Sequence, residues 1–121
     1  MRVELTLDCF DLDAVAAFWG AALRCPVNQV IEGRYASLHG AGIVMSLQRV
    51  TEPKTSKNRM HLDLLVADLD TEVTRLETLG ATRLTATARQ EFGQTWYVLA
   101  DPEGNEFCVA RDPSSTESRH A

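Results

Sequence analysis

Side chains that can bind a cation or transfer a proton recur at every second position of several short segments. Alternate side chains of a β-strand point to the same face of a sheet, so each segment predicts one polar and one apolar face. The residues expected on the polar face are Glu4, Thr6, Asp8, Ser46, Gln48, His61, Asp63, Glu106 and Cys108. Four of them are carboxylates, and a bound cation would relieve the repulsion among them. This face is therefore the candidate functional surface.

The elements that must position this face follow one another in the same order twice. Periods of two and of 3.6 residues, with turn residues between them, indicate strands and helices. The first set is predicted as strand, helix and three strands at residues 3–9, 13–23, 27–31, 34–38 and 43–50. The second set is predicted at residues 60–66, 69–79, 82–86, 95–99 and 106–110. Asp13 is expected to cap the first helix and Gly80 to end the second.

An internal duplication explains this order. Asp11-Leu12-Asp13 aligns with Asp68-Leu69-Asp70, and the strands before them align without a gap. Each half is short for an independent fold, so one structural domain built from two modules is expected. The predicted modules are residues 1–50 and 59–112, joined by a polar linker at 51–58 and followed by a flexible tail at 113–121.

The composition restricts the classes of function. The chain has 121 residues with 12 Lys+Arg and 17 Asp+Glu, a formal net charge of −5, which argues against binding to nucleic acid or an anionic membrane. No apolar stretch approaches the roughly 20 residues of a membrane span, and no secretion signal is recognisable. The chain has three cysteines, Cys9, Cys25 and Cys108, and no two of them have CxxC spacing. An odd number without that motif argues against a disulfide framework. These features indicate a cytoplasmic globular protein.

Two motifs resemble the vicinal oxygen chelate superfamily, which includes glyoxalase I, extradiol dioxygenases and bleomycin-resistance proteins. They are Asp101-Pro102-Glu103-Gly104-Asn105-Glu106-Phe107 and Asn58-Arg59-Met60-His61-Leu62-Asp63-Leu64, and Phe18-Trp19 also fits. The sequence is most similar to short glyoxalase-like domain proteins over residues 3–112. The resemblance implies an α+β fold: two tandem βαβββ modules form an open, cup-shaped mixed β-sheet with the helices outside.

The resemblance also implies a ligand set, because in metal-dependent members the first and last strands of each module supply the ligands. The matching positions in this chain are Glu4, His61, Ser46 and Cys108. Glu4, His61 and Cys108 suit one divalent ion, such as Zn, Ni, Mn or Fe. Cys108 stands where the family usually has glutamate, and Glu106 is the nearest carboxylate to the position of the catalytic base. No organic cofactor is implied.

The sequence is compatible with two functions that use the cup. In one, a metal held by His61 and Glu4 assists a lyase, isomerase or dioxygenase reaction on a small organic molecule. In the other, His61 hydrogen-bonds Glu4 or Asp63 in a metal-free cup that binds or sequesters a small molecule, as in the bleomycin-resistance group. A ligand-free accessory domain is a third hypothesis. A homodimer is expected as the commonest oligomer, and the modules could pair within one chain or between two.

Aromatic residues complete the predicted pocket. Trp96 and Tyr97 are neighbours on one strand, so one should face the helix and the other the cup, without an indication of which. Phe92 lies in the loop before that strand and is a candidate for the lip of the cup.

Overall fold

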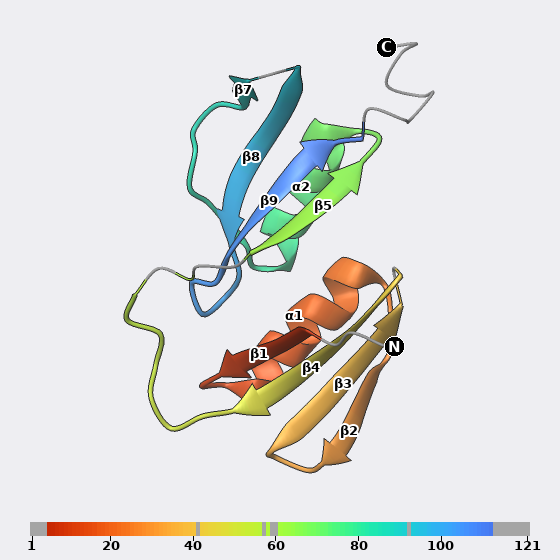
Figure 1. Cartoon of the computed structure of the whole chain (residues 1–121), viewed down its shortest axis with the longest axis vertical. Coiled ribbons are helices and arrows are strands. Elements are labelled where there is room, and N and C mark those ends of the chain that lie inside the picture. The colour runs from red at the N-terminus through yellow and green to blue at the C-terminus, as the bar shows by residue number, and fades with distance from the viewer. Residues whose placement is uncertain (1–4, 41, 57, 59–60, 92, 113–121) are drawn as a thin grey trace. The chain divides into compact units, whose positions relative to one another are not determined.

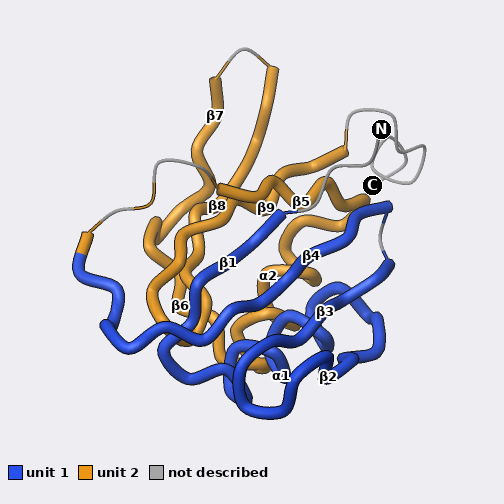
Figure 2. Tube along the Cα trace, turned by 60° about the horizontal axis from the view of Figure 1, so that its bottom comes forward, with its two compact units in different colours: residues 1–55 blue, residues 56–121 orange. Residues whose placement is uncertain are grey.

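The chain folds as two compact units, residues 1–55 and residues 56–121 (Figure 2). The computed structural model describes residues 5–40, 42–56, 58, 61–91 and 93–112. Each unit is a mixed β-sheet with one helix. The expected tail at 113–121 lies outside the described residues.

The first unit contains five elements in the order strand, helix and three strands. They are β1 (Leu5–Cys9), α1 (Leu12–Leu23), β2 (Val27–Ile31), β3 (Tyr35–Gly40) and β4 (Ile43–Arg49). The sheet order is β1-β4-β3-β2, with β1 parallel to β4 and the other pairs antiparallel. The helix between β1 and β2 passes behind the sheet (Figure 1).

The second unit repeats this plan with one strand divided. It contains β5 (Leu62–Val66), α2 (Leu69–Leu79), β6 (Thr82–Arg83), β7 (Arg89–Glu91), β8 (Gln94–Ala100) and β9 (Glu106–Arg111). β9 lies between parallel β5 and antiparallel β8, while β6 and β7 share the other edge of β8. The predicted strand at 82–86 is therefore shorter, and β7 was not predicted. The βαβββ order and the α+β class are confirmed.

Both helices begin at matching aspartates. The carboxylate of Asp11 accepts a hydrogen bond from the backbone N–H of Ala14 at 3.1 Å, and that of Asp68 accepts one from Thr71 at 3.2 Å. The prediction of Asp13 as the cap of α1 was wrong, because Asp13 lies inside the first turn, where a negative charge still favours the helix. Gly80 caps the end of α2 with a φ of +120°.

The buried apolar side chains of each sheet lie on the face that carries the helix. On the last strands, Met45, Leu47, Phe107 and Val109 are at most 2% exposed, as the alternation predicted. The described helices contribute their own buried stripes, including Val15 in α1 and Val73 in α2. Residues that alternate with these on the strands must point to the opposite, open face of each sheet.

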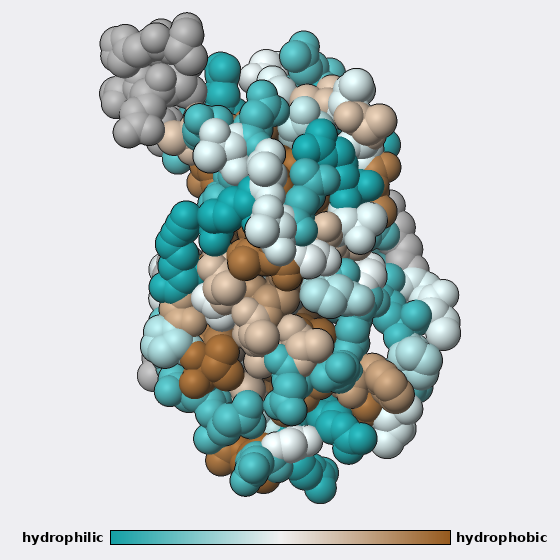
Figure 3. Space-filling model, turned by 180° about the vertical axis from the view of Figure 1, so that it is seen from behind, coloured by the Kyte–Doolittle hydropathy of each residue, from teal (hydrophilic) through white to brown (hydrophobic). Residues whose placement is uncertain are grey.

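The outer faces of the two helices differ in character. In the view of Figure 3, tan and brown surface lies over α1, whereas the surface of the second unit is mostly teal and white. The exposed positions of α1 include Ala14, Ala17 and Ala21, and those of α2 include Thr71 and Thr74. Neither described helix is both long and apolar enough to cross a membrane.

Candidate functional site

The open face of the second sheet is hollowed into a groove of about 590 Å³. Its lining residues come from four strands and from the position before β5: His61, Asp63, Leu65, Glu91, Gln94, Trp96, Cys108 and Ala110. On β9, Cys108 stands between Phe107 and Val109, which are buried on the helix side. The groove therefore lies on the face of the sheet opposite the core of this unit.

The strand register arranges the groove residues in rows across the sheet. Three successive rows are Asp63–Cys108–Val98, Leu65–Ala110–Trp96–Arg89 and Gln94–Glu91. Because the rows follow one another along the strands, the indole of Trp96 lies between the row of Asp63 and the row of Glu91. The groove thus has an apolar middle with a carboxylate toward each end.

His61, Asp63 and Cys108 form a compact group on one side of the groove. One ligand atom from each lies within 4.8 Å of the others, and His61 Nε2 is 3.5 Å from Asp63 Oδ1. Two ligands of a tetrahedral zinc ion, with bonds of about 2.0–2.1 Å, stand about 3.4 Å apart. The distance between His61 and Asp63 matches this separation, and the 4.8 Å span of the whole group is wider, so the three side chains would have to draw together around a zinc-like ion.

The thiol of Cys108 is protonated at neutral pH. Burial raises its pKa to about 11, and Asp63 adds to the increase through its charge and a hydrogen bond. The charge of Glu106 acts in the same direction, whereas Arg89 lowers the pKa. Since the thiolate is the metal ligand, a cation at this group would have to displace the proton.

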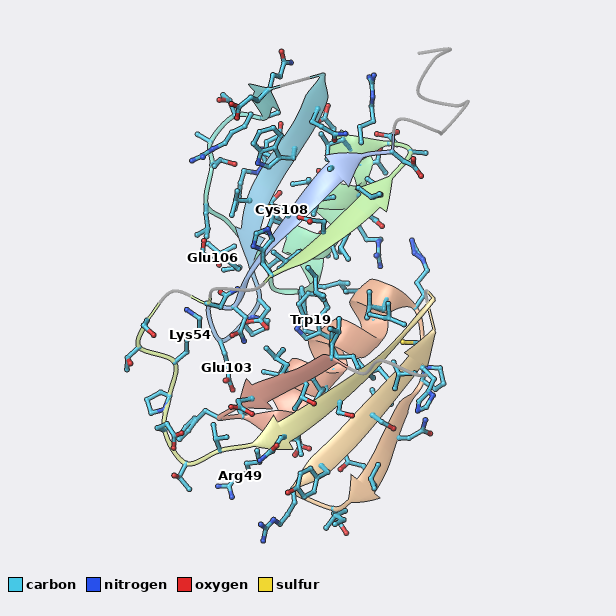
Figure 4. The ribbon with its side chains drawn as sticks, in the orientation of Figure 1. Trp19, Arg49, Lys54, Glu103, Glu106 and Cys108 are labelled. Carbon is cyan, nitrogen blue, oxygen red and sulfur yellow. The ribbon has the colours of Figure 1, made fainter. Side chains whose placement is uncertain are left out.

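The start of β9 is fixed by two side chains. The amide of Asn58 accepts from the backbone N–H of Glu106 at 3.0 Å and donates to its carbonyl at 3.4 Å. Asp101, which is 3% exposed, accepts from the backbone N–H groups of Glu103 and Asn105 at 2.9 Å each. These bonds set where β9 begins, and so where Glu106 and Cys108 stand along it (Figure 4).

The neighbouring aromatic residues of β8 lie on opposite faces of the sheet. Trp96 lines the groove. The hydroxyl of Tyr97 donates to Asp70 of α2 at 3.3 Å, and the guanidinium of Arg83 lies 4.7 Å from the centre of its ring. The expectation that included Tyr97 among the pocket residues is therefore corrected, because Tyr97 belongs to the helix side.

The other predicted pocket residues belong to the first unit or lie outside the described residues. Thr6 pairs with Ser46 and Asp8 with Gln48 on the parallel strands β1 and β4. These residues share one face of the first sheet, whereas the groove contains residues of the second unit only. Glu4 and Phe92 lie outside the described residues.

Four lining residues were not predicted as site residues: Leu65, Glu91, Gln94 and Ala110. Leu65 follows Asp63 by two residues and so shares its face, but an apolar side chain gives no signal of a binding site in the sequence. Glu91 and Gln94 pair across the hairpin that joins β7 to β8. The signal that could have identified this hairpin is Gly93, whose φ of +77° is typical of a tight turn.

Two βαβββ units with the same strand order, one of them with a groove on its open face, have the architecture of the glyoxalase/bleomycin resistance/dioxygenase fold. The model of the glyoxalase-like domain family matches residues 4–110. The chain therefore belongs to the family of glyoxalase-like domain proteins, as the motifs predicted. In sequence, no curated protein matches the chain.

Solved structures with the same fold are distant in sequence. A glyoxalase/bleomycin resistance protein/dioxygenase family enzyme from Burkholderia phytofirmans is 18% identical with a TM-score of 0.76, covering 89% of this chain and 95% of that one. A glyoxalase-related enzyme from Fulvimarina pelagi is 23% identical with a TM-score of 0.73, covering 93% and 88%. A lactoylglutathione lyase from Agrobacterium tumefaciens is 18% identical with a TM-score of 0.69, covering 92% of each chain. These matches establish the fold.

Proposed function

We propose that this glyoxalase-like protein binds a small organic molecule in the groove of its second unit. The observation that supports the proposal is the apolar surface on the open face, where Leu65 is 57% exposed and Trp96 is partly exposed. Concave sites of about 300–1,000 Å³ with apolar walls and a few polar groups are typical of small-molecule binding. A groove of about 590 Å³ falls within that range.

The polar groups would orient the ligand. Gln94 can both donate and accept hydrogen bonds, whereas Asp63 and Glu91 accept when ionised. His61 supplies a ring nitrogen at the edge of the groove, 46% exposed in its side chain. The ligand would therefore cover Leu65 and Trp96 while its polar atoms meet the side chains around them.

Binding of the neutral dye Nile red tests this proposal, because its fluorescence rises when it leaves water. We expect Leu65→Ala and Trp96→Ala to weaken dye binding at least severalfold. Leu84→Ala is the matched control, since Leu84 is 49% exposed but does not line the groove. Equal dye binding by Leu65→Ala, Trp96→Ala and the unmodified protein would contradict the proposal.

The group of His61, Asp63 and Cys108 supports a second candidate function, a metal-assisted lyase, isomerase or dioxygenase reaction. These three side chains would hold the divalent cation. When bound, such an ion polarises an oxygen atom of the substrate. Glu106 lies two residues before Cys108 on the same face of β9, where its carboxylate could accept a proton from a bound molecule.

Metal titration followed by calorimetry tests the second candidate. We expect Zn²⁺ to bind the protein with a stoichiometry near one, and His61→Ala or Cys108→Ser to abolish that binding. His39→Ala is the matched control, because His39 is an exposed histidine of the first unit. A protein that binds none of Zn²⁺, Ni²⁺, Mn²⁺ and Fe²⁺, or whose His61→Ala variant binds as the unmodified protein does, would rule this candidate out.

A further inference from the structure

We propose that the groove selects organic cations, with a flat or apolar part of the ligand on Trp96 and a positive group at the carboxylate of Asp63 or Glu91. The inference rests on the proposed binding function and adds the chemical class of the ligand. It concerns a molecule with a carbon skeleton, and so differs from the metal site at His61, Asp63 and Cys108.

The charges on the groove face are mainly negative. Asp63 and Glu91 line the groove, and Glu106 lies on the same face of β9. Among the described residues of this face, Arg89 is the one permanent cation, opposite Trp96 on β7. His61 is positive only when protonated. Within the described part of the chain, three carboxylates therefore outweigh one guanidinium.

The two lining carboxylates retain capacity for a ligand. Glu91 forms no ion pair or side-chain hydrogen bond with any described residue. Asp63 lies 3.5 Å from the nitrogen of His61, beyond the usual hydrogen-bond length, and its side chain is 59% exposed. An ionised carboxylate offers about four lone-pair positions, so the hydrogen bond from the thiol of Cys108 leaves most of them available.

The position of Trp96 between these carboxylates suits a cation joined to a flat group. Successive rows lie two residues apart along a strand, which is about 7 Å. A positive group attached to a ring on Trp96 by one or two bonds can therefore approach the carboxylate of either neighbouring row. The face of an indole also attracts a cation directly. An anionic ligand on Trp96 would have a carboxylate in each of the two neighbouring rows and the guanidinium of Arg89 in its own row, so carboxylates still predominate around it.

Three compounds that share a 1-naphthylmethyl group and differ in charge test the inference. They are 1-naphthylmethylamine, a cation at pH 7, 1-naphthalenemethanol, which is neutral, and 1-naphthylacetate, an anion. We expect calorimetry at low salt to rank their affinities in that order. The cation should bind about two- to fivefold more tightly than the alcohol, the factor that an exposed ion pair gives. Added salt should reduce this preference.

Charge-neutralising variants identify the carboxylates responsible. Asp63→Asn and Glu91→Gln should each reduce the preference for the amine over the alcohol, because each removes a negative charge from the groove. Glu32→Gln removes the same charge from an exposed turn of the first unit and should leave the preference unchanged.

The outcomes separate this inference from the proposed function on which it rests. Equal affinity for the three compounds, a preference for 1-naphthylacetate, or a preference that survives both Asp63→Asn and Glu91→Gln overturns the inference while the groove still binds. Failure of all three compounds to bind, together with Nile red binding that does not depend on Leu65 or Trp96, overturns the proposed function as well.

Discussion

Asp63 and Cys108 stand directly opposite each other on the parallel strands β5 and β9, with the thiol as hydrogen-bond donor to the carboxylate. Parallel pairing brings together residues that are far apart in the chain. The pair joins the first and last strands of the unit, on the face opposite the core. Both proposed functions use Asp63, and the pKa of the Cys108 thiol beside it depends on the charge of Asp63.

The alkylation rate of Cys108 should depend on pH with a midpoint near 11, because the thiolate is the nucleophile and burial raises the pKa of this thiol to about 11. Asp63→Asn should lower the midpoint by removing a charge that disfavours the thiolate. Mass spectrometry of the modified peptide, in a Cys25→Ser background, measures the rate. A midpoint at the ordinary thiol value of 9.0 would contradict the assignment.

The same pKa predicts how stability depends on pH. The folded-state pKa of Cys108 lies above the ordinary value of 9.0, so the unfolded chain loses this proton first as pH rises. Proton loss from Cys108 therefore leaves the free energy of unfolding unchanged below about pH 9. Between pH 9 and 11 it lowers the free energy of unfolding progressively. Urea unfolding of Cys108→Ala should show a smaller loss of stability over that interval, and identical profiles would contradict the prediction.

Asn58→Ala should destabilise the second unit by about 1–3 kcal/mol, because two backbone groups of Glu106 lose their partner. Asn28→Ala on exposed β2 is the control and should have a much smaller effect. Urea unfolding measures both variants. A loss for Asn58→Ala no larger than that of the control would show that the start of β9 does not depend on this side chain.

Gly93→Ala and Gly33→Ala should each cost about 1 kcal/mol of stability, because their φ values are +77° and +75° and L-residues avoid this region. Neither added Cβ would contact other atoms, so the cost comes from the backbone alone. Only Gly93→Ala should also weaken ligand binding, since this turn positions Glu91 and Gln94. Equal effects of the two variants on Nile red binding would contradict the role of the hairpin.

Trp96→Phe and Tyr97→Phe test the assignment of the two aromatic residues to opposite faces. Tyr97→Phe removes the hydrogen bond to Asp70 and should cost about 1 kcal/mol or less, without a change in Nile red binding. Trp96→Phe should weaken dye binding and leave stability nearly unchanged. The reverse pattern would require the two side chains to exchange faces.

The sequence predicted the fold well because the buried face of each strand or helix leaves a periodic pattern of apolar residues. That pattern can be recognised within one short segment, without knowledge of its neighbours in space. The face of Cys108 followed from its position between Phe107 and Val109. The cap of α1 was misplaced by two residues because Asp11 and Asp13 are both suitable residue types, and only backbone geometry distinguishes them. The matching aspartate Asp68 in the second half could have resolved the choice.

The site was harder to predict than the fold because it depends on register. The family positions did not assign a metal-binding role to Asp63. It belongs to the candidate metal group because β5 pairs with β9 in a register that sets Asp63 opposite Cys108. Glu91 was missed because β7 has three residues, too few to show a period. Trp96 and Tyr97 could not be separated because both are large, aromatic and equally suited to a core or to a pocket.

In both units the last strand to be synthesised is an inner one: β4 inserts between β1 and β3, and β9 between β5 and β8. A nascent chain that has emerged from the ribosome only as far as Ala100 holds β5 and β8 with no partner strand between them. Neither sheet can close until its final segment arrives, and closure then joins residues from opposite ends of the unit. Folding during translation should therefore proceed one whole unit at a time, with long-range pairing as its slow step.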